Sequence, residues 1–150
     1  MGLTFEEFCQ FKSQIEMPEG FESGATNFIF EDAIEFIRER GYDETMIEFY
    51  PKNIFTEELV ELYLFFKDKM TVIQFHSNGK RNYSFSTTTR YYKDVNEISS
   101  ERHQEFSRLR MFLSFNDGKE YKFDNIDDTN VHYAKNTRKK LENIYNLLDY

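Results

Sequence analysis

The sequence RLRMFLSF at residues 108–115, followed by NDGK at 116–119 and EYKF at 120–123, decides how this chain folds. In the first segment every second residue from Leu109 is apolar, which predicts a strand with one face on a hydrophobic core. The Asp-Gly pair supplies the positive φ angles that a tight hairpin turn requires. The two aromatic residues of the third segment fall on one face and its charged residues on the other. The stretch therefore predicts a β-hairpin with one apolar face.

The period of the pattern lengthens to three and four residues after residue 130, which predicts an amphipathic helix. The stripe on its inner side consists of Val131, Ala134, Arg138, Leu141, Ile144, Tyr145 and Leu148. Because a hairpin cannot bury its apolar face alone, we expect this helix to cover it. We expect Asp127, Asp128 or Thr129 to supply hydrogen-bond acceptors and negative charge to the first turn of the helix.

The region between residues 46 and 104 predicts further antiparallel strands joined by short polar turns. β-Branched and aromatic residues mark the strands, and Asn78-Gly79 is the strongest turn signal. The expected strands are 46–50, ended by Pro51, then 62–66, 70–75, 81–88 and a kinked strand at 91–98. Residues 99–104 are expected to form a loop or one helical turn, and the segment from Thr56 to Leu62 fits either a helix or a strand.

The first 50 residues predict two helices. Thr4 and Glu7 are spaced as a capping box, in which the two residues bond reciprocally at a helix start. A second helix is expected over about 27–40, with Gly41 in the position that ends helices. Cys9 lies among the apolar residues of the first helix, and we expect it to act as a small core residue.

The order of these elements predicts an α+β fold. An N-terminal helical segment is followed by a strongly bent antiparallel sheet or small barrel, which a C-terminal helix caps. We expect residues 1–50 to form an acidic helical segment that packs on residues 51–150, so that the chain makes one compact unit.

The charge of the chain is concentrated in its front part. Residues 1–50 carry 12 acidic and 3 basic side chains, and residues 51–150 carry 15 and 16, which together give the net charge of −8. Phosphate contacts need an excess of lysine and arginine, so the acidic front argues against nucleic-acid binding. It is either a solvated face that keeps the protein soluble or a surface for a basic partner. The residues of such a surface would be Glu31, Asp32, Glu35 and Glu39.

The sequence also bears on location. No run of about 18 apolar residues occurs, so we expect no transmembrane segment. The N-terminus lacks the basic and apolar regions of a secretory signal. Cys9 is the only cysteine, which excludes an intramolecular disulfide framework. Together these features predict a cytoplasmic protein.

The segment YKDVNEI at residues 92–98, the DGK turn at 117–119 and the amphipathic last helix resemble the pleckstrin-homology-like (PH-like) domains of bacteria. The resemblance covers about residues 59–148. It implies a barrel capped by its terminal helix, which acts as a binding module and not as an enzyme. The whole chain also resembles small phage- or prophage-type proteins of Gram-positive bacteria whose function is unknown, and that resemblance implies no activity.

No catalytic or cofactor motif stands out from the sequence. The three histidines, His76, His103 and His132, are far apart, and none has a second ligand three or four residues away. We therefore expect no metal site. There is no P-loop, no nucleophile elbow and no Gly-rich phosphate loop, so we expect no catalytic residue and no cofactor.

Two sets of residues could still act on or bind anions. Glu120 and Lys122, with Asp94 or Asp117 upstream, resemble the arrangement of metal-dependent nucleases, in which carboxylates hold Mg²⁺ and a lysine lies beside the phosphate. The same two residues also fit the solvent face of any hairpin strand. The second set lies at two hairpin turns and consists of Lys67, Lys69, Lys80 and Arg81. They would form an anion or partner site if both turns lay at one end of a barrel.

The sequence favours a non-enzymatic protein-interaction module. Its expected partner is another protein of unknown identity, with self-association into a homo-oligomer as a further form of contact. Two alternatives stay open. One is a small metal-dependent nuclease that uses Glu120 and Lys122, and the other is an inhibitor that uses residues 1–50 as an acidic mimic of nucleic acid.

Overall fold

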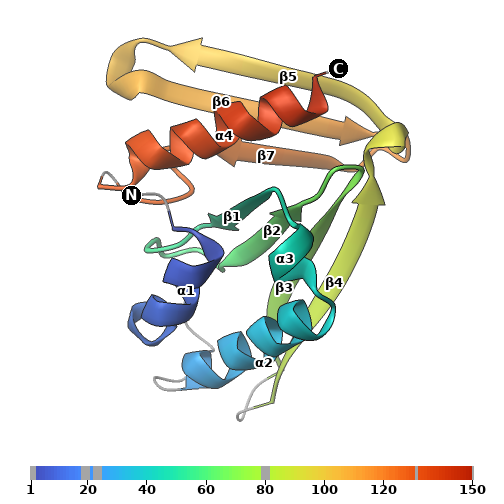
Figure 1. Ribbon diagram of the computed structural model, residues 1–150. Helices are drawn as coiled ribbons and strands as arrows, with labels where there is room; N and C mark the ends of the chain where they lie inside the picture. Colours follow the sequence, from blue (N-terminus) through green and yellow to red (C-terminus); the bar gives the residue numbers. More distant parts are fainter. Residues whose placement is uncertain (1–2, 18–20, 22–24, 79–81, 131, 150) are drawn as a thin grey trace.

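The computed structural model describes residues 3–17, 21, 25–78, 82–130 and 132–149. The described strands form two antiparallel sheets with helices packed against them (Figure 1). The first sheet has the order β1-β2-β3-β4 and the second has the order β5-β6-β7. The strands are β1 Glu48–Lys52, β2 Glu61–Phe65, β3 Lys69–Ser77, β4 Tyr83–Tyr91, β5 Val95–His103, β6 Arg108–Phe115 and β7 Glu120–Asp124. The helices are α1 Phe5–Phe11, α2 Ala25–Glu39, α3 Tyr42–Thr45 and α4 Ala134–Leu148, with 3-10 turns η1 Lys12–Gln14, η2 Tyr92–Asp94 and η3 Glu105–Ser107.

The β6–β7 hairpin forms as the alternation predicts. Every second residue of β6 is buried, beginning with Leu109. Gly118 in the turn has a φ of 90°, a conformation that glycine adopts without steric cost. Tyr121 and Phe123 are the buried aromatic residues of β7 and pair with Leu113 and Met111 of β6, respectively. The strand-turn-strand prediction is confirmed, and so is its apolar face.

The predicted hairpins of the middle region are also confirmed. β2 and β3 pair antiparallel, with Leu62 opposite Ile73. β3 and β4 then pair over their whole length without a shift in register. Gly79, in the turn between them, lies outside the described residues. Tyr83 and Phe85 of β4 are half-buried against the core under the front helices, as the sequence predicts.

The front helices α1 and α2 cover one face of the first sheet (Figure 1). The capping box is present, since the Glu7 N–H donates to Thr4 Oγ1 at 3.1 Å and the Thr4 N–H donates to Glu7 Oε1 at 3.3 Å. The core beneath is largely aromatic: the ring centroid of Phe30 lies 5.2 Å from that of Phe8 and 5.1 Å from that of Phe75. These edge-to-face contacts join both helices to the central strand. We call this the front core.

The opposite face of the first sheet packs against the second sheet and α4, and we call this the back core. Tyr50 and Tyr63 of the first sheet make edge-to-face contacts with Phe123 of the second, at centroid distances of 5.3 and 4.9 Å. Leu141 and Ile144 of α4 are fully buried in the same cluster. The helix covers the hairpin, as its stripe predicts. The first sheet is therefore shared between two cores, one on each face.

The α+β class is confirmed, with helical elements before and after the sheets. The strands form two separate sheets and not a closed barrel. The 3-10 turn η2 separates β4 from β5, so the two strands join different sheets. None of the described helices is both long enough and apolar enough to cross a membrane.

Several boundaries differ from the sequence-based expectation. The first strand does not end at Pro51, because β1 continues through it to Lys52. Proline is tolerated there since β1 is an edge strand. Residues 99–104 do not form a loop: β5 runs to His103. None of the residues of β5 is fully buried, and an edge strand that faces water needs few apolar residues.

The expected cap of the last helix is wrong. α4 begins at Ala134 after Tyr133, with no side-chain cap, so Asp127, Asp128 and Thr129 all lie upstream of its first turn. Asp128 instead turns into the back core, where its Oδ2 accepts from the Tyr50 hydroxyl at 2.7 Å. Val131, the first residue of the expected stripe, lies outside the described residues.

Candidate protein-binding groove

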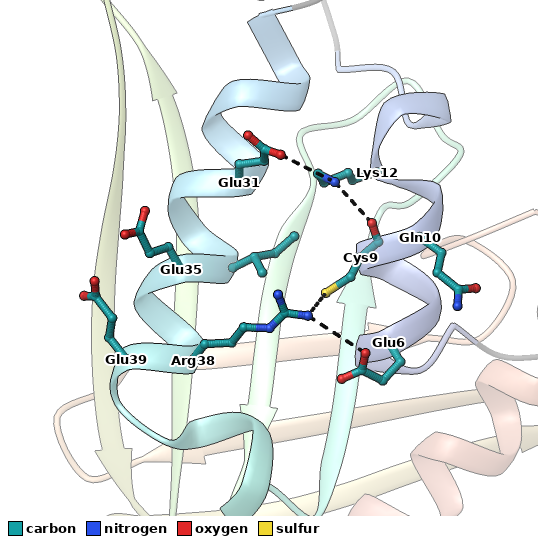
Figure 2. Close-up of a pocket in the computed structure, with 9 residues that line it drawn as sticks. Glu6, Cys9, Gln10, Lys12, Glu31, Glu35, Arg38 and Glu39 are labelled. Carbon is teal, nitrogen blue, oxygen red and sulfur yellow. Dashed lines mark hydrogen bonds and ion pairs between the residues drawn. The ribbon is translucent and has the colours of Figure 1, made fainter.

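The front helices leave a groove between them, shown in Figure 2. It has a volume of about 580 Å³ and is lined by side chains of α1, η1 and α2. The lining residues are Glu6, Cys9, Gln10, Lys12, Glu31, Ile34, Glu35, Arg38 and Glu39. Four of these are acidic and two are basic, so the groove carries an excess of negative charge.

The helical period places these residues around the groove. On α2, Glu31, Glu35 and Glu39 recur every four residues and so follow one row of the helix surface. Ile34 lies beside this row and is almost fully buried. On the facing helix, Glu6 and Cys9 are three residues apart and share one side. The groove is therefore the polar border of the front core, where two amphipathic helices meet.

The two cations of the groove already have partners. Lys12 Nζ lies 3.7 Å from Glu31 Oε1 and donates to the carbonyl oxygen of Cys9 at 3.3 Å. Arg38 Nη2 lies 3.9 Å from Glu6 Oε2 (Figure 2). These pairs are long and solvent-accessible, so they hold the helices together only weakly.

Glu35 and Glu39 are exposed and have no ion-pair partner among the residues that the structure describes. In Figure 2 their carboxylates point away from Lys12 and Arg38. They lie one helical turn apart, at a spacing of about 6 Å between their Cβ atoms. At the rim of the groove, α2 thus presents two adjacent carboxylates that no described side chain pairs with.

Cys9 lies inside the groove but is not an activated thiol. Burial raises its pKa, and the negative charge of Glu6 raises it further, while Arg38 lowers it. The Arg38 guanidinium lies 3.7 Å from the Cys9 sulfur. Because the thiolate is the nucleophile, a raised pKa makes Cys9 a poor one at neutral pH. Its half-buried position against the front core agrees with a packing role.

Three of the four acidic residues that the sequence singled out line this groove. Asp32 is the fourth: it is exposed on α2 but does not line it. The sequence interpretation missed the residues from the facing helix, among them Glu6 and Lys12. Glu6 lies in α1 and Lys12 in the following turn η1, and only packing against α2 shows that both face the acidic row.

Only two of the four basic residues that the sequence grouped lie among the residues that the structure describes. Lys67 and Lys69 lie at the β2–β3 turn, at the first end of β3. The ammonium of Lys69 lies 5.6 Å from the ring centroid of Phe66. Lys80 and Arg81 lie outside the described residues, and the chain leaves β3 towards them from its other end, after Ser77. Whether these two residues share one end with Lys67 and Lys69 therefore stays a prediction of the sequence.

Glu120 and Lys122 lie on the exposed face of β7. The hydroxyl of Ser114 donates to the Glu120 carboxylate at 3.4 Å. Asp117 is paired with Arg90, whose Nη1 donates to it at 2.9 Å and lowers its pKa. Among the described residues, no three acidic, histidine or cysteine side chains are placed to hold a metal ion.

A second polar cluster lies at the corner between β7 and α4, and the sequence did not reveal it. Asp128 Oδ2 accepts from the Asp124 N–H at 2.8 Å as well as from Tyr50, and burial raises the pKa of Asp128 to about 6. Burial would also raise the pKa of Asp124, but hydrogen bonds from Arg110 and from backbone N–H groups outweigh it and lower that pKa. The cluster is buried and its polar groups bond to one another, so it fits a structural role better than a binding site. We call this cluster of Tyr50, Asp124 and Asp128 the back lock.

Comparisons with known proteins give no relative for this chain. No protein-family model, no curated protein and no solved structure matches it. The function must therefore be argued from the geometry of the groove.

Proposed function

We propose that this protein is a non-enzymatic interaction module that binds a basic segment of another protein along α2, at the rim of the groove between α1 and α2. The observation that carries the proposal is the pair Glu35 and Glu39, two exposed carboxylates without a described partner on the wall of a groove of about 580 Å³. A cation that reaches them replaces water at a site where the field is already negative.

The geometry favours a partner with two positive charges at matching spacing. Two lysine or arginine side chains one helical turn apart are separated by about 6 Å and so match the two carboxylates. Arginine fits best, because its planar guanidinium bonds a carboxylate through two parallel N–H donors.

Part of this proposal is that the chain is a PH-like and phage-type protein, as its sequence resemblances imply. A series of antiparallel hairpins followed by a helix that packs over them is consistent with a PH-like binding module. Fold by itself assigns no ligand, so the groove and not the resemblance carries the functional argument. The proposed location of the protein is the cytoplasm.

The test is a pull-down from cell lysate with the full chain and with the double variant Glu35→Gln, Glu39→Gln. We expect the wild-type chain to retain a partner at low salt and to lose it at high salt, because exposed charges are screened. The double variant is expected to retain none. A matched control is Glu57→Gln, Glu58→Gln, which removes the same charge from exposed residues away from the groove.

Two results would overturn the proposal. One is a partner that the double variant retains as well as the wild type and the control do. The other is a Mg²⁺-dependent hydrolysis of nucleic acid that the substitution Glu120→Ala abolishes, since that would make the protein an enzyme.

A further inference from the structure

Each sheet of this protein ends in two edge strands, and these strands differ in how their outer groups are bonded. β1 and β4 border the first sheet, and β5 and β7 border the second. An edge strand presents a row of N–H and C=O groups that can pair with another chain unless something blocks them. Whether an edge can pair with another chain therefore depends on what bonds to its outward N–H and C=O groups.

The edge of β1 is blocked. In an antiparallel strand the outward and inward residues alternate, and on β1 the outward ones are Phe49 and Pro51. Lys140 of α4 donates to the carbonyl oxygen of Phe49 at 2.8 Å, and proline has no N–H to offer. The strand is also only five residues long.

The edges of the second sheet are blocked as well. On β7, Lys52 donates to the carbonyl oxygen of Lys122, and the Asp124 N–H is taken by the side chain of Asp128. β5 contains a shift in register between Val95 and Glu97. It also carries charged side chains near its other end, one of which pairs with α4. Shifts and charges of this kind are the usual protection of sheet edges.

Among the residues that the structure describes, the edge of β4 from Phe85 to Thr89 shows none of these protections. Its nine residues, YSFSTTTRY, contain no proline and no glycine, and Arg90 is their only charge. The pairing with β3 runs from Tyr83 to Tyr91 without a bulge. Most of the strand is exposed, and no described strand pairs with its outer side. Figure 1 shows β4 along the outer margin of the first sheet.

Two backbone hydrogen bonds show which groups of β4 point outward. The Asn78 N–H donates to the Asn82 carbonyl, and the Tyr92 N–H donates to the Asp68 carbonyl. Both belong to the same register as the β3–β4 ladder. By alternation, the even-numbered residues of β4 bond to β3, and Phe85, Thr87 and Thr89 direct their N–H and C=O groups to the free edge.

We propose that the outer edge of β4 pairs with β4 of a second copy of this chain, antiparallel and about a two-fold axis at Thr87. Thr87 is the central one of the three outward residues Phe85, Thr87 and Thr89, so this axis uses all of them. Phe85 then lies opposite Thr89 of the second copy. The Thr87–Thr87 pair and the Phe85–Thr89 pair each exchange two backbone hydrogen bonds between the copies, because both members of each pair direct their N–H and C=O groups outward. The first sheet becomes one continuous sheet across the two copies.

The side chains of β4 fit a second copy in this register. Arg90 lies opposite Ser84 of the second copy, so no like charges meet. The Thr87 side chains meet at the axis, and threonine pairs are favourable across strands. A two-fold interface must be complementary to itself. β4 meets this condition, because its residues fit against the same strand in the reverse direction about Thr87. The interface does not involve the α1–α2 groove and so does not depend on its proposed role.

The first test is sedimentation of the full chain between about 10 μM and 1 mM, a range that detects weak dimers. We expect a concentration-dependent dimer of the 18.2 kDa chain. The substitution Thr87→Pro removes an outward N–H and no bond to β3, so we expect it to weaken the dimer at least tenfold with the circular dichroism spectrum unchanged. Thr87→Val keeps the N–H and is the matched control, which should dimerise like the wild type.

The second test fixes the register. In a Cys9→Ser background, Thr87→Cys places two thiols at the axis, where Cα atoms of a bonded pair lie about 5.5 Å apart, a distance that suits a disulfide. We expect oxidation to cross-link this variant into a dimer. Thr88→Cys, on the opposite face and off the axis, should cross-link at least tenfold more slowly. A chain that stays monomeric throughout the range, a dimer that Thr87→Pro leaves intact, or equal cross-linking of both cysteine variants overturns the proposal.

Discussion

The front and back cores share one sheet but are bordered by polar groups in opposite ways. At the back, polar side chains are buried and bonded: Lys140 bridges Glu48 and the Phe49 carbonyl at 2.8 Å each, with little of either side chain exposed. At the front, the borders are long, exposed ion pairs such as that of Arg38 with Glu6. Glu35 and Glu39 have no described partner there at all.

The difference indicates where the molecule holds its shape and where it can bind. Bonded polar groups in a buried border fix the angle between elements, because breaking one leaves its partner unsatisfied. Exposed carboxylates on a groove are already hydrated and exchange water for a partner at little cost. The back border therefore acts as a lock, and the front border is available for contacts.

The largest expected effect tests whether the two cores are one cooperative unit. Phe30 is the fully buried centre of the front core and Phe123 that of the back core. Replacing either by alanine should lower the free energy of unfolding by about 3–5 kcal/mol. Because the first sheet belongs to both cores, each variant should unfold in urea in a single transition. A second transition in Phe30→Ala alone would show that residues 1–50 unfold independently.

The next effect concerns pH and belongs to the back lock. The pKa of Asp128 is raised by burial to about 6, against about 4 in an unfolded chain, so the folded state binds an extra proton between these values. The stability should therefore fall as the pH rises from about 4 to about 6, by up to about 3 kcal/mol. Urea denaturation across this range measures the fall.

The control for this effect uses the neighbouring carboxylates. Asp128→Asn keeps an oxygen that can accept from Tyr50 and removes the titrating group, so it should abolish the fall. Asp127→Asn changes an exposed carboxylate and should preserve it. The lowered pKa of Asp124 acts in the opposite direction and at lower pH, because its contribution is lost as the pH drops below about 4. A flat profile for the wild type would contradict the assignment.

A smaller loss is expected from Asn125, which ties the lock to its neighbours. Its Oδ1 accepts from the Leu109 N–H at 2.7 Å, and its Nδ2 donates to the carbonyl oxygens of Ser107 and Ala134 at 3.2 and 3.0 Å. Asn125→Ala should cost about 2 kcal/mol, since the buried Leu109 N–H is left without a partner. Thermal unfolding checks this, and a loss below about 0.5 kcal/mol would show that water replaces the side chain.

The smallest effect is expected at the front border. Glu6→Gln removes an exposed ion pair at 3.9 Å and should change the stability by less than about 0.5 kcal/mol. It should nevertheless lower the pKa of Cys9, because the negative charge of Glu6 raises that pKa. The rate of Cys9 with a thiol reagent as a function of pH measures the shift. Arg38→Gln should shift the pKa upward, and the same direction in both variants would contradict the geometry.

Local patterns in the sequence were sufficient for much of the fold. The alternation of β6, the Asp-Gly turn and the capping box of α1 each depend on residues within a few positions of one another, and each was predicted correctly. The errors occurred where the local signal was opposed by tertiary contacts. Asp128 looks like a helix cap in the sequence, but the hydroxyl of Tyr50, 78 residues away, draws it into the core. Pro51 looks like a strand end, but an edge strand does not need its N–H.

The groove was predicted in part. The acidic row of α2 follows from helical period alone, so three of its residues could be named in advance. The facing residues Glu6, Cys9 and Lys12 could not, because helical period gives the face of α1 but not its neighbour.

By itself the sequence determined the α+β class, most of the strands, the helix over the β6–β7 hairpin and the acidic character of the front. These follow from hydrophobic period and charge, which act between near neighbours in the chain. Only the tertiary structure decided that the strands form two sheets around two cores, that Asp124 and Asp128 build a buried lock, and that β4 keeps an open edge. The reason is physical: burial, strand order and pKa shifts depend on which distant residues exclude water from one another, and no local pattern records that.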